Sequence, residues 1–121
     1  MREFLERTWF LNRAIVSEDI ERTLDVASEY LPLTIHRFPS GLSCFDWVIP
    51  QHWTVRAAYV ESPDGERIID WSWHPLHLVI GSLPFRGTVS RDELLRHLHT
   101  SSAHPDCIPY HFQYYQLGWG F

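Results

Sequence analysis

The sequence predicts an α+β fold, in which a helical N-terminal segment is followed by a mainly antiparallel β domain with one short helix. Apolar residues recur at helical spacing before residue 32, whereas alternating and turn-forming residues dominate 33–85. A capping box then precedes a leucine-rich stretch near residue 94. The chain has 121 residues, of which 45% are hydrophobic and 21% charged, values that are typical of one globular module.

The first thirty residues are predicted to form two helices. A loose apolar stripe marks the first helix, and it consists of Phe4, Leu5, Trp9, Leu11 and Ile15. Ser17 is expected to cap the second helix, since its hydroxyl can accept a hydrogen bond from a backbone N–H of the first turn. One apolar face follows at helical spacing, formed by Ile20, Leu24, Ala27 and Leu31. Pro32 should end this helix.

The stretch 33–85 is predicted to be antiparallel sheet. Short strands are expected at 34–38, 45–49, 55–61, 67–71 and 76–80. The strongest turn is Ser62-Pro63-Asp64-Gly65, because proline presets φ and glycine tolerates positive φ. These runs predict at least one regular β-hairpin.

The C-terminal third combines a short helix, a loop and an aromatic tail. Ser90 and Glu93 form a capping box, so a helix is expected from there to about His99. Pro105 and Pro109 exclude regular structure from the loop that follows. The tail ends on Trp119-Gly120-Phe121, which is unusual for a free C-terminus. Part of the sheet or core that this tail joins is therefore expected to lie outside the chain.

Composition argues against several classes of partner. The net charge is −5, lysine is absent and the ten arginines are scattered, so no basic stripe favours nucleic acid. No apolar run reaches the roughly 18 residues of a membrane span, and the N-terminus does not resemble a signal peptide. Cys44 and Cys107 are expected to be reduced, partly buried thiols. A cytoplasmic location is predicted.

The aromatic content is high, with six Trp, five Tyr and seven Phe. Such residues fill cores, but they also anchor interfaces and line pockets. Both uses remain open from the sequence.

One cluster of candidate metal ligands, His97, His99, His104 and Cys107, has unfavourable geometry. His97 and His99 would point about 200° apart on a helix, and the spacing matches no standard zinc pattern. No nucleophile elbow or phosphate-binding loop occurs either. The residues by themselves predict no metal site and no catalytic set, although a small metallo- or thiol enzyme remains a third hypothesis.

A series of short motifs runs along the chain. The series is Pro39-Ser40-Gly41, Phe45-Asp46-Trp47-Val48-Ile49-Pro50, Trp53, Ala58-Tyr59, Asp64-Gly65-Glu66-Arg67-Ile68-Ile69, Leu76-His77-Leu78-Val79, Leu83-Pro84-Phe85, Val89-Ser90-Arg91-Asp92-Glu93-Leu94, His97-Leu98-His99-Thr100, Pro105-Asp106-Cys107-Ile108-Pro109-Tyr110 and Tyr114-Tyr115 before Trp119-Gly120-Phe121. In this order the motifs resemble the N-terminal part of a bacterial and archaeal family of zinc aminopeptidase-like proteins. The resemblance implies that 1–35 matches the helical opening of a peptidase domain. It implies that 36–121 corresponds mainly to a nested β-rich, lid-like domain beside the active-site cleft, with its last residues leading back into the catalytic sheet.

The same resemblance implies that the catalytic machinery lies outside this chain. In such proteins the ligands of the paired zinc ions and the general base follow the segment matched here, so no catalytic residue, metal ligand or cofactor is assigned to this sequence. We expect a lid or substrate-recognition part, inactive alone, whose partner is the missing catalytic domain or a partner subunit. The candidate cleft-facing residues are His77, His99, Asp106, Tyr110 and Tyr114. The alternative is a stand-alone binding module that self-associates through its aromatic residues.

Overall fold

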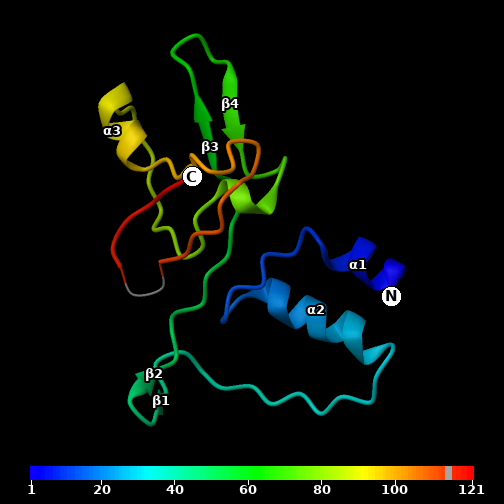
Figure 1. Ribbon diagram of the computed structural model, residues 1–121. Helices are drawn as coiled ribbons and strands as arrows, with labels where there is room; N and C mark the ends of the chain where they lie inside the picture. The colour runs from blue at the N-terminus through cyan, green and yellow to red at the C-terminus, as the bar shows by residue number, and fades with distance from the viewer. Residues whose placement is uncertain (114–115) are drawn as a thin grey trace. The chain divides into compact units, whose positions relative to one another are not determined.

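The computed structural model describes residues 1–113 and 116–121 and confirms the α+β class (Figure 1). Its elements are α1 (Arg2–Thr8), α2 (Glu18–Ser28), β1 (Ser43–Cys44), β2 (Trp47–Val48), β3 (Tyr59–Glu61), β4 (Arg67–Asp70), the 3-10 helix η1 (Pro75–His77) and α3 (Arg91–Arg96). The chain forms two compact units, Met1–Val55 and Arg56–Phe121. The predicted boundary near residue 35 refers to longer relatives and stays a prediction.

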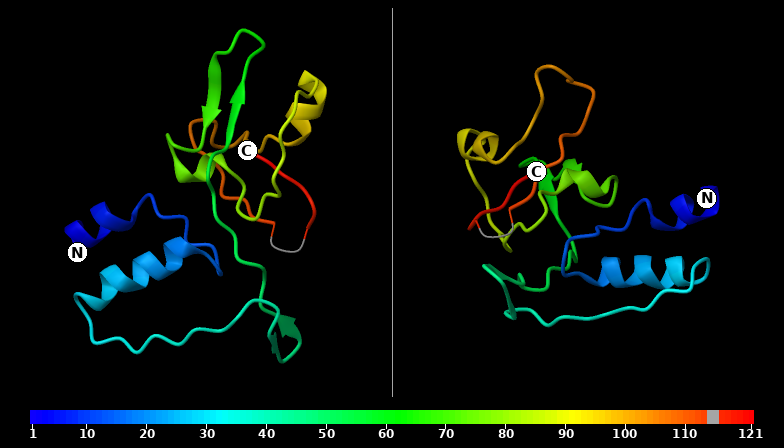
Figure 2. Two further views of the ribbon diagram at one scale, coloured as in Figure 1. Left: turned by 180° about the vertical axis from the view of Figure 1, so that it is seen from behind. Right: turned by 60° about the horizontal axis from the view of Figure 1, so that its bottom comes forward.

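In the first unit, α1 and α2 lie side by side, as both views of Figure 2 show. Both guanidinium nitrogens of Arg7 on α1 donate to the Glu29 carboxylate just after α2, each at 2.6 Å. Phe4 packs edge-on against Tyr30, with ring centroids 6.2 Å apart. The contact between the two helices is therefore fastened by one bidentate ion pair and one aromatic pair.

The predicted cap of α2 is confirmed. Ser17 Oγ accepts the Ile20 N–H at 3.2 Å, and the same buried hydroxyl lies 3.0 Å from the Ala14 carbonyl. The helix ends at Ser28, earlier than expected, and Leu31 is 57% exposed. The apolar face therefore stops one turn short of Pro32.

Two strands predicted in this unit are wrong. Residues 34–38 form no strand, because no neighbouring segment pairs with their backbone. The stretch 45–49 is not one strand but contains a turn, since Phe45 adopts φ 56° and reverses the chain between Cys44 and Trp47. The resulting two-residue hairpin joins β1 to β2.

The hairpin predicted around Ser62-Pro63-Asp64-Gly65 is confirmed in the second unit. Strand β3 pairs antiparallel with β4, placing Tyr59 opposite Asp70 and Val60 opposite Ile69. Gly65 adopts φ 82°, and its N–H donates to the Ser62 carbonyl at 3.0 Å. The turn-forming residues therefore determine where this hairpin reverses.

The strand expected at 76–80 begins instead as the 3-10 helix η1. His74 caps it, because its Nδ1 accepts the Leu76 N–H at 3.1 Å, and Pro75 supplies a preset φ at the first position. Leu78, Val79 and Ile80 then run extended and are the buried hydrophobic residues of this unit within the described part of the chain. Val79 also lines the pocket described below.

Helix α3 begins at the predicted cap, where Ser90 Oγ accepts the Glu93 N–H at 3.2 Å. It ends at Arg96, and His97 has left helical geometry. Across the described residues, no helix has the length and apolar content that crossing a bilayer requires.

Candidate functional site

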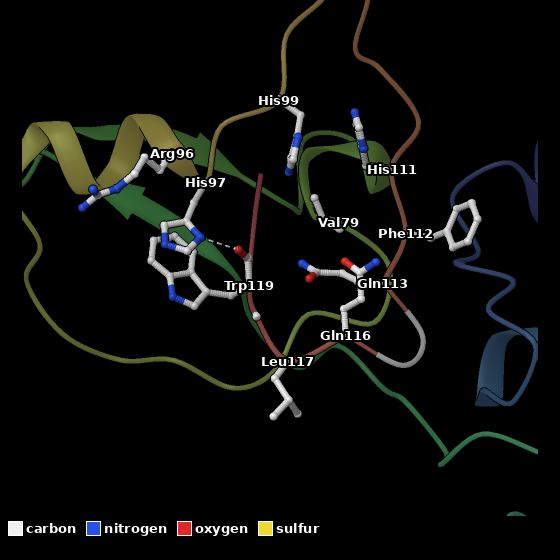
Figure 3. Close-up of a pocket in the computed structure, with 11 residues that line it drawn as sticks. Val79, Arg96, His97, His99, His111, Phe112, Gln113, Gln116, Leu117 and Trp119 are labelled. Carbon is white, nitrogen blue, oxygen red and sulfur yellow. Dashed lines mark hydrogen bonds between the residues drawn. The ribbon is translucent and has the colours of Figure 1, made fainter.

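A pocket of about 250 Å³ opens in the second unit, around residues 116–121, which are called the C-terminal segment below (Figure 3). Three imidazoles and two carboxamides belong to its lining, which is formed by Val79, Arg96, His97, His99, His111, Phe112, Gln113, Gln116, Leu117, Gly118 and Trp119. The lining residues come from three stretches of the chain, so the fold and not one local motif creates the pocket.

The C-terminal segment is held on both sides by backbone hydrogen bonds. On one side, the Val79 N–H donates to the Gly120 carbonyl at 3.0 Å and the Leu83 N–H donates to the Gly118 carbonyl at 2.7 Å. On the other side, the Phe121 N–H donates to the His97 carbonyl at 2.9 Å and the His99 N–H donates to the Phe121 carbonyl at 2.8 Å. The segment thus joins the stretches that carry the pocket.

His97 is fixed by three contacts. Its Nδ1 lies 2.7 Å from the Trp119 carbonyl oxygen, and its Nε2 lies 3.1 Å from Glu93 Oε1. Its ring stacks on the Trp119 indole with centroids 3.8 Å apart, and Phe85 also stacks on that indole at 4.8 Å. Because both nitrogens face acceptors, His97 positions Trp119 and is engaged within the protein.

His99 and His111 form a stacked pair at the pocket, with ring centroids 4.0 Å apart and planes 28° from parallel. Partial burial lowers the pKa of His99 below its ordinary value, and the nearby His111 and His97 lower it further. Protonation of the His99 ring is therefore disfavoured in the free protein, because the site is partly buried and the neighbouring groups are histidines.

The sequence-predicted candidates lie in several places. His99 lines the pocket, whereas His77, Asp106 and Tyr110 are not among its lining residues. His77 belongs to η1, and its Nδ1 lies 2.9 Å from the Asp70 carbonyl oxygen. Asp106 and Tyr110 are exposed, and Tyr114 lies outside the described residues.

Sequence reasoning missed His111, Gln113 and Gln116 as pocket residues. They belong to the tail that was singled out only for its aromatic content. Alternating polar groups, with His111 and Gln113 two positions apart, were the available signal.

The resemblance places the ligands of the paired zinc ions outside this chain, so a metal site among the described residues has to be judged from their own geometry. No group of three or more His, Cys, Asp or Glu side chains in 1–113 and 116–121 is placed to hold a metal ion. Both cysteines are free thiols, as predicted, but they are exposed and not partly buried, because Cys44 lies in the short β1–β2 hairpin and Cys107 in the loop after α3.

Residues 52–121 match the model of a domain of unknown function (DUF2172). The chain belongs to this family. The DUF2172 match spans more than half of the chain and contains every residue of the pocket.

A curated protein and a solved structure, both from Clostridium acetobutylicum, resemble the DUF2172 chain and are much longer than it. One is 37% identical over 117 residues, and its name provisionally describes a polysaccharide biosynthesis protein with an aminopeptidase-like domain. The other is a crystal structure of a provisionally assigned peptidase, with a TM-score of 0.93 and 36% identity over 98% of this chain. The chain covers only 27% of the first relative and 28% of the second.

Proposed function

We propose that this chain is the substrate-recognition or lid-forming part of an aminopeptidase-like protein and works together with a catalytic part that it does not itself contain. One observation carries the proposal. Nearly the whole chain, 97%, aligns with a relative whose name includes an aminopeptidase-like domain, yet it accounts for 27% of that relative. The recognition role is supported by a pocket lined with hydrogen-bonding groups beside aromatic rings.

The amount of exposed surface supports a missing partner. The chain exposes 9410 Å². Two separate globules of the sizes of the two units would together expose about 8,200 Å². The area that the chain exposes beyond that of two such globules is of the size that a stable protein interface covers.

The tip of the β1–β2 hairpin is the surface best suited to this partner. Phe45 is fully exposed and holds φ 56°, a conformation that disfavours residues other than glycine. Leu42, Trp47 and Val48 surround it in sequence and are also exposed. An exposed aromatic residue held in a strained turn is typical of an interface anchor.

Association is the first test of the proposal. The chain is mixed with the part of the C. acetobutylicum relative that lies outside the matched segment, and binding is measured by titration calorimetry. We expect a 1:1 complex that Phe45→Gly weakens by about 10-fold or more, in the range of an interface hot spot. Phe38→Gly removes another exposed Phe, 64% exposed, from a segment without positive φ and serves as control.

Activity is the second test. A chimera carries this chain in place of the matched segment of the relative, and hydrolysis of aminoacyl p-nitroanilides is followed. If the chain recognises substrate, alanine at His77, His99 or Tyr110 raises KM with little change in kcat. Unchanged KM in all three variants, in an active chimera, contradicts the recognition role.

Self-association is the second candidate function, and the same exposed apolar surface favours it. It predicts a dimer or larger species of the chain alone in light scattering, reduced by Phe45→Gly. A monomer that binds the remainder of the relative supports the first proposal instead.

A further inference from the structure

The lining of the pocket is rich in N–H donors and poor in negative charge. His99, His111, Gln113 and Gln116 all supply N–H groups, and no Asp or Glu is among the lining residues that the structure describes. Arg96 also lines the pocket, but in Figure 3 its side chain extends away from His99 and His111, and its guanidinium pairs with the Glu93 carboxylate. Neutral donors without competing carboxylates favour an anionic group over a cation.

The ring nitrogens of the stacked pair are available to a ligand. Among the described residues, no hydrogen bond reaches a ring nitrogen of His99 or His111, in contrast to His97, whose two nitrogens are both engaged. Two protonated imidazoles 4.0 Å apart would repel each other. An anion that accepts from both rings removes this repulsion.

We propose that this pocket binds a carboxylate, from a peptide C-terminus or an acidic side chain, and that the His99–His111 pair takes up a proton when it binds. A carboxylate has two oxygens that can accept from both rings or from one ring and a glutamine amide. The volume of about 250 Å³ suits such a small group. The inference deepens the proposed function, since it names the ligand class of the pocket on which the recognition role rests, and binding can be measured without a peptidase partner.

The donor set favours a carboxylate over a phosphate. Phosphate sites combine fixed positive charge with backbone N–H groups at a helix N-terminus or an anion nest. Here the guanidinium of Arg96 is committed to Glu93, and α3 presents its C-terminal end to His97. A monovalent anion balanced by one protonated imidazole fits this lining better.

Proton uptake gives the binding a defined pH dependence. The charged groups near the pair are Arg96 and Glu93, which pair with each other, and the titratable ring of His97 also lies close by. Burial and the neighbouring histidines hold the pKa of His99 low in the free protein, so an anion must raise it. Affinity should rise as pH falls, by at most about 10-fold per pH unit for one proton.

The test uses the 121-residue chain and proton NMR of the histidine rings. N-acetylglycine is titrated between about pH 5.5 and 7.5, where the acid remains ionised, with N-acetylglycinamide as the uncharged match. We expect the acid to shift the ring protons of His99 and His111 saturably, more tightly at low pH, and the amide to leave them unmoved.

Variants separate the site from general effects. His111→Phe keeps a ring for His99 to stack on but removes the nitrogens, and should weaken the acid at least about 10-fold, the loss expected for a charge-assisted hydrogen bond. His111→Gln replaces it if the first variant does not fold. His104→Phe, at an exposed position outside the pocket, should bind as the wild type does.

Three results overturn the inference: equal shifts from acid and amide, no saturable shift from either, or tighter binding of inorganic phosphate than of the acid. An affinity independent of pH removes the proton-uptake part. None of these outcomes depends on association with the remainder of a relative, so the two proposals fail separately.

Discussion

Gly120 occupies the tightest point of the C-terminal segment. A Cβ added there would lie 3.0 Å from Val79 Cγ2, 3.1 Å from the His97 carbonyl oxygen and 3.2 Å from His99 Nε2. The His97 oxygen cannot move away easily, since it accepts the Phe121 N–H at 2.9 Å. Gly120→Ala must therefore displace either the segment or the pocket wall.

The expected cost follows from two opposing terms. Forcing an extra methyl group into a packed site costs about 1–3 kcal/mol. Replacing glycine by alanine returns about 0.4–1 kcal/mol through the reduced entropy of the unfolded chain. The free energy of unfolding should fall by about 1–2 kcal/mol, which lowers Tm by about 5–10 °C for a unit of this size.

Urea unfolding followed by tryptophan fluorescence measures this change, with calorimetry for Tm. Gly87→Ala is the matched control, because the added Cβ would meet only the Phe85 ring, at 3.3 Å, and no backbone atom, and Phe85 is 52% exposed. The control should change stability by less than about 0.5 kcal/mol, as surface substitutions do.

Equal stability of the Gly120→Ala and Gly87→Ala proteins would refute the close packing of the segment. A loss confined to Gly120→Ala, together with altered ring-proton shifts of His99, would support it.

Three further predictions concern the first unit. Ser17→Ala removes the cap of α2 and should lower the free energy of unfolding by about 1–2 kcal/mol, measured by urea unfolding, while the exposed Ser28→Ala changes it little. The Arg7 guanidinium lowers the pKa of Glu29. The contribution of this ion pair to stability is therefore fully present above the ordinary carboxyl pKa of 4.5 and is lost as pH falls through the lowered pKa. A titration of the Glu29 carboxyl by NMR that follows the ordinary pKa contradicts this. Phe45→Gly relieves the positive φ and should raise Tm slightly or leave it unchanged, whereas a clear fall in Tm would show a packing role.

Capping and turn chemistry were readable from the sequence because they depend on neighbouring residues. Ser17 and Ser90 cap helices as predicted, and Gly65 forms the expected turn. The side-chain hydrogen bonds involved span at most four residues. Such local rules hold whatever the rest of the chain does.

The errors concern partners that only the folded chain supplies. Alternation at 34–38 predicted a strand, but a strand exists only where another segment pairs with it. At 45–49 the chain reverses at Phe45, a residue that carries no turn signal in its side chain. At 76–80 the local effect of Pro75 and His74 outweighed apolar alternation.

The pocket was only partly predictable for the same reason. His99 was singled out, but its partner His111 lies twelve positions away across a loop and meets it through tertiary structure. No periodicity in the sequence indicates that the two imidazole rings stack.

The order of synthesis gives the C-terminal segment a role in the timing of folding. Its backbone partners Val79, Leu83 and His97 leave the ribosome well before Gly118 and Gly120 do. The second unit can complete these backbone hydrogen bonds only after residue 121 has left the exit tunnel. Until then Val79 and its neighbours are exposed to water or bound by chaperones. Nascent chains stalled short of this segment should accordingly be the species most readily cleaved by protease.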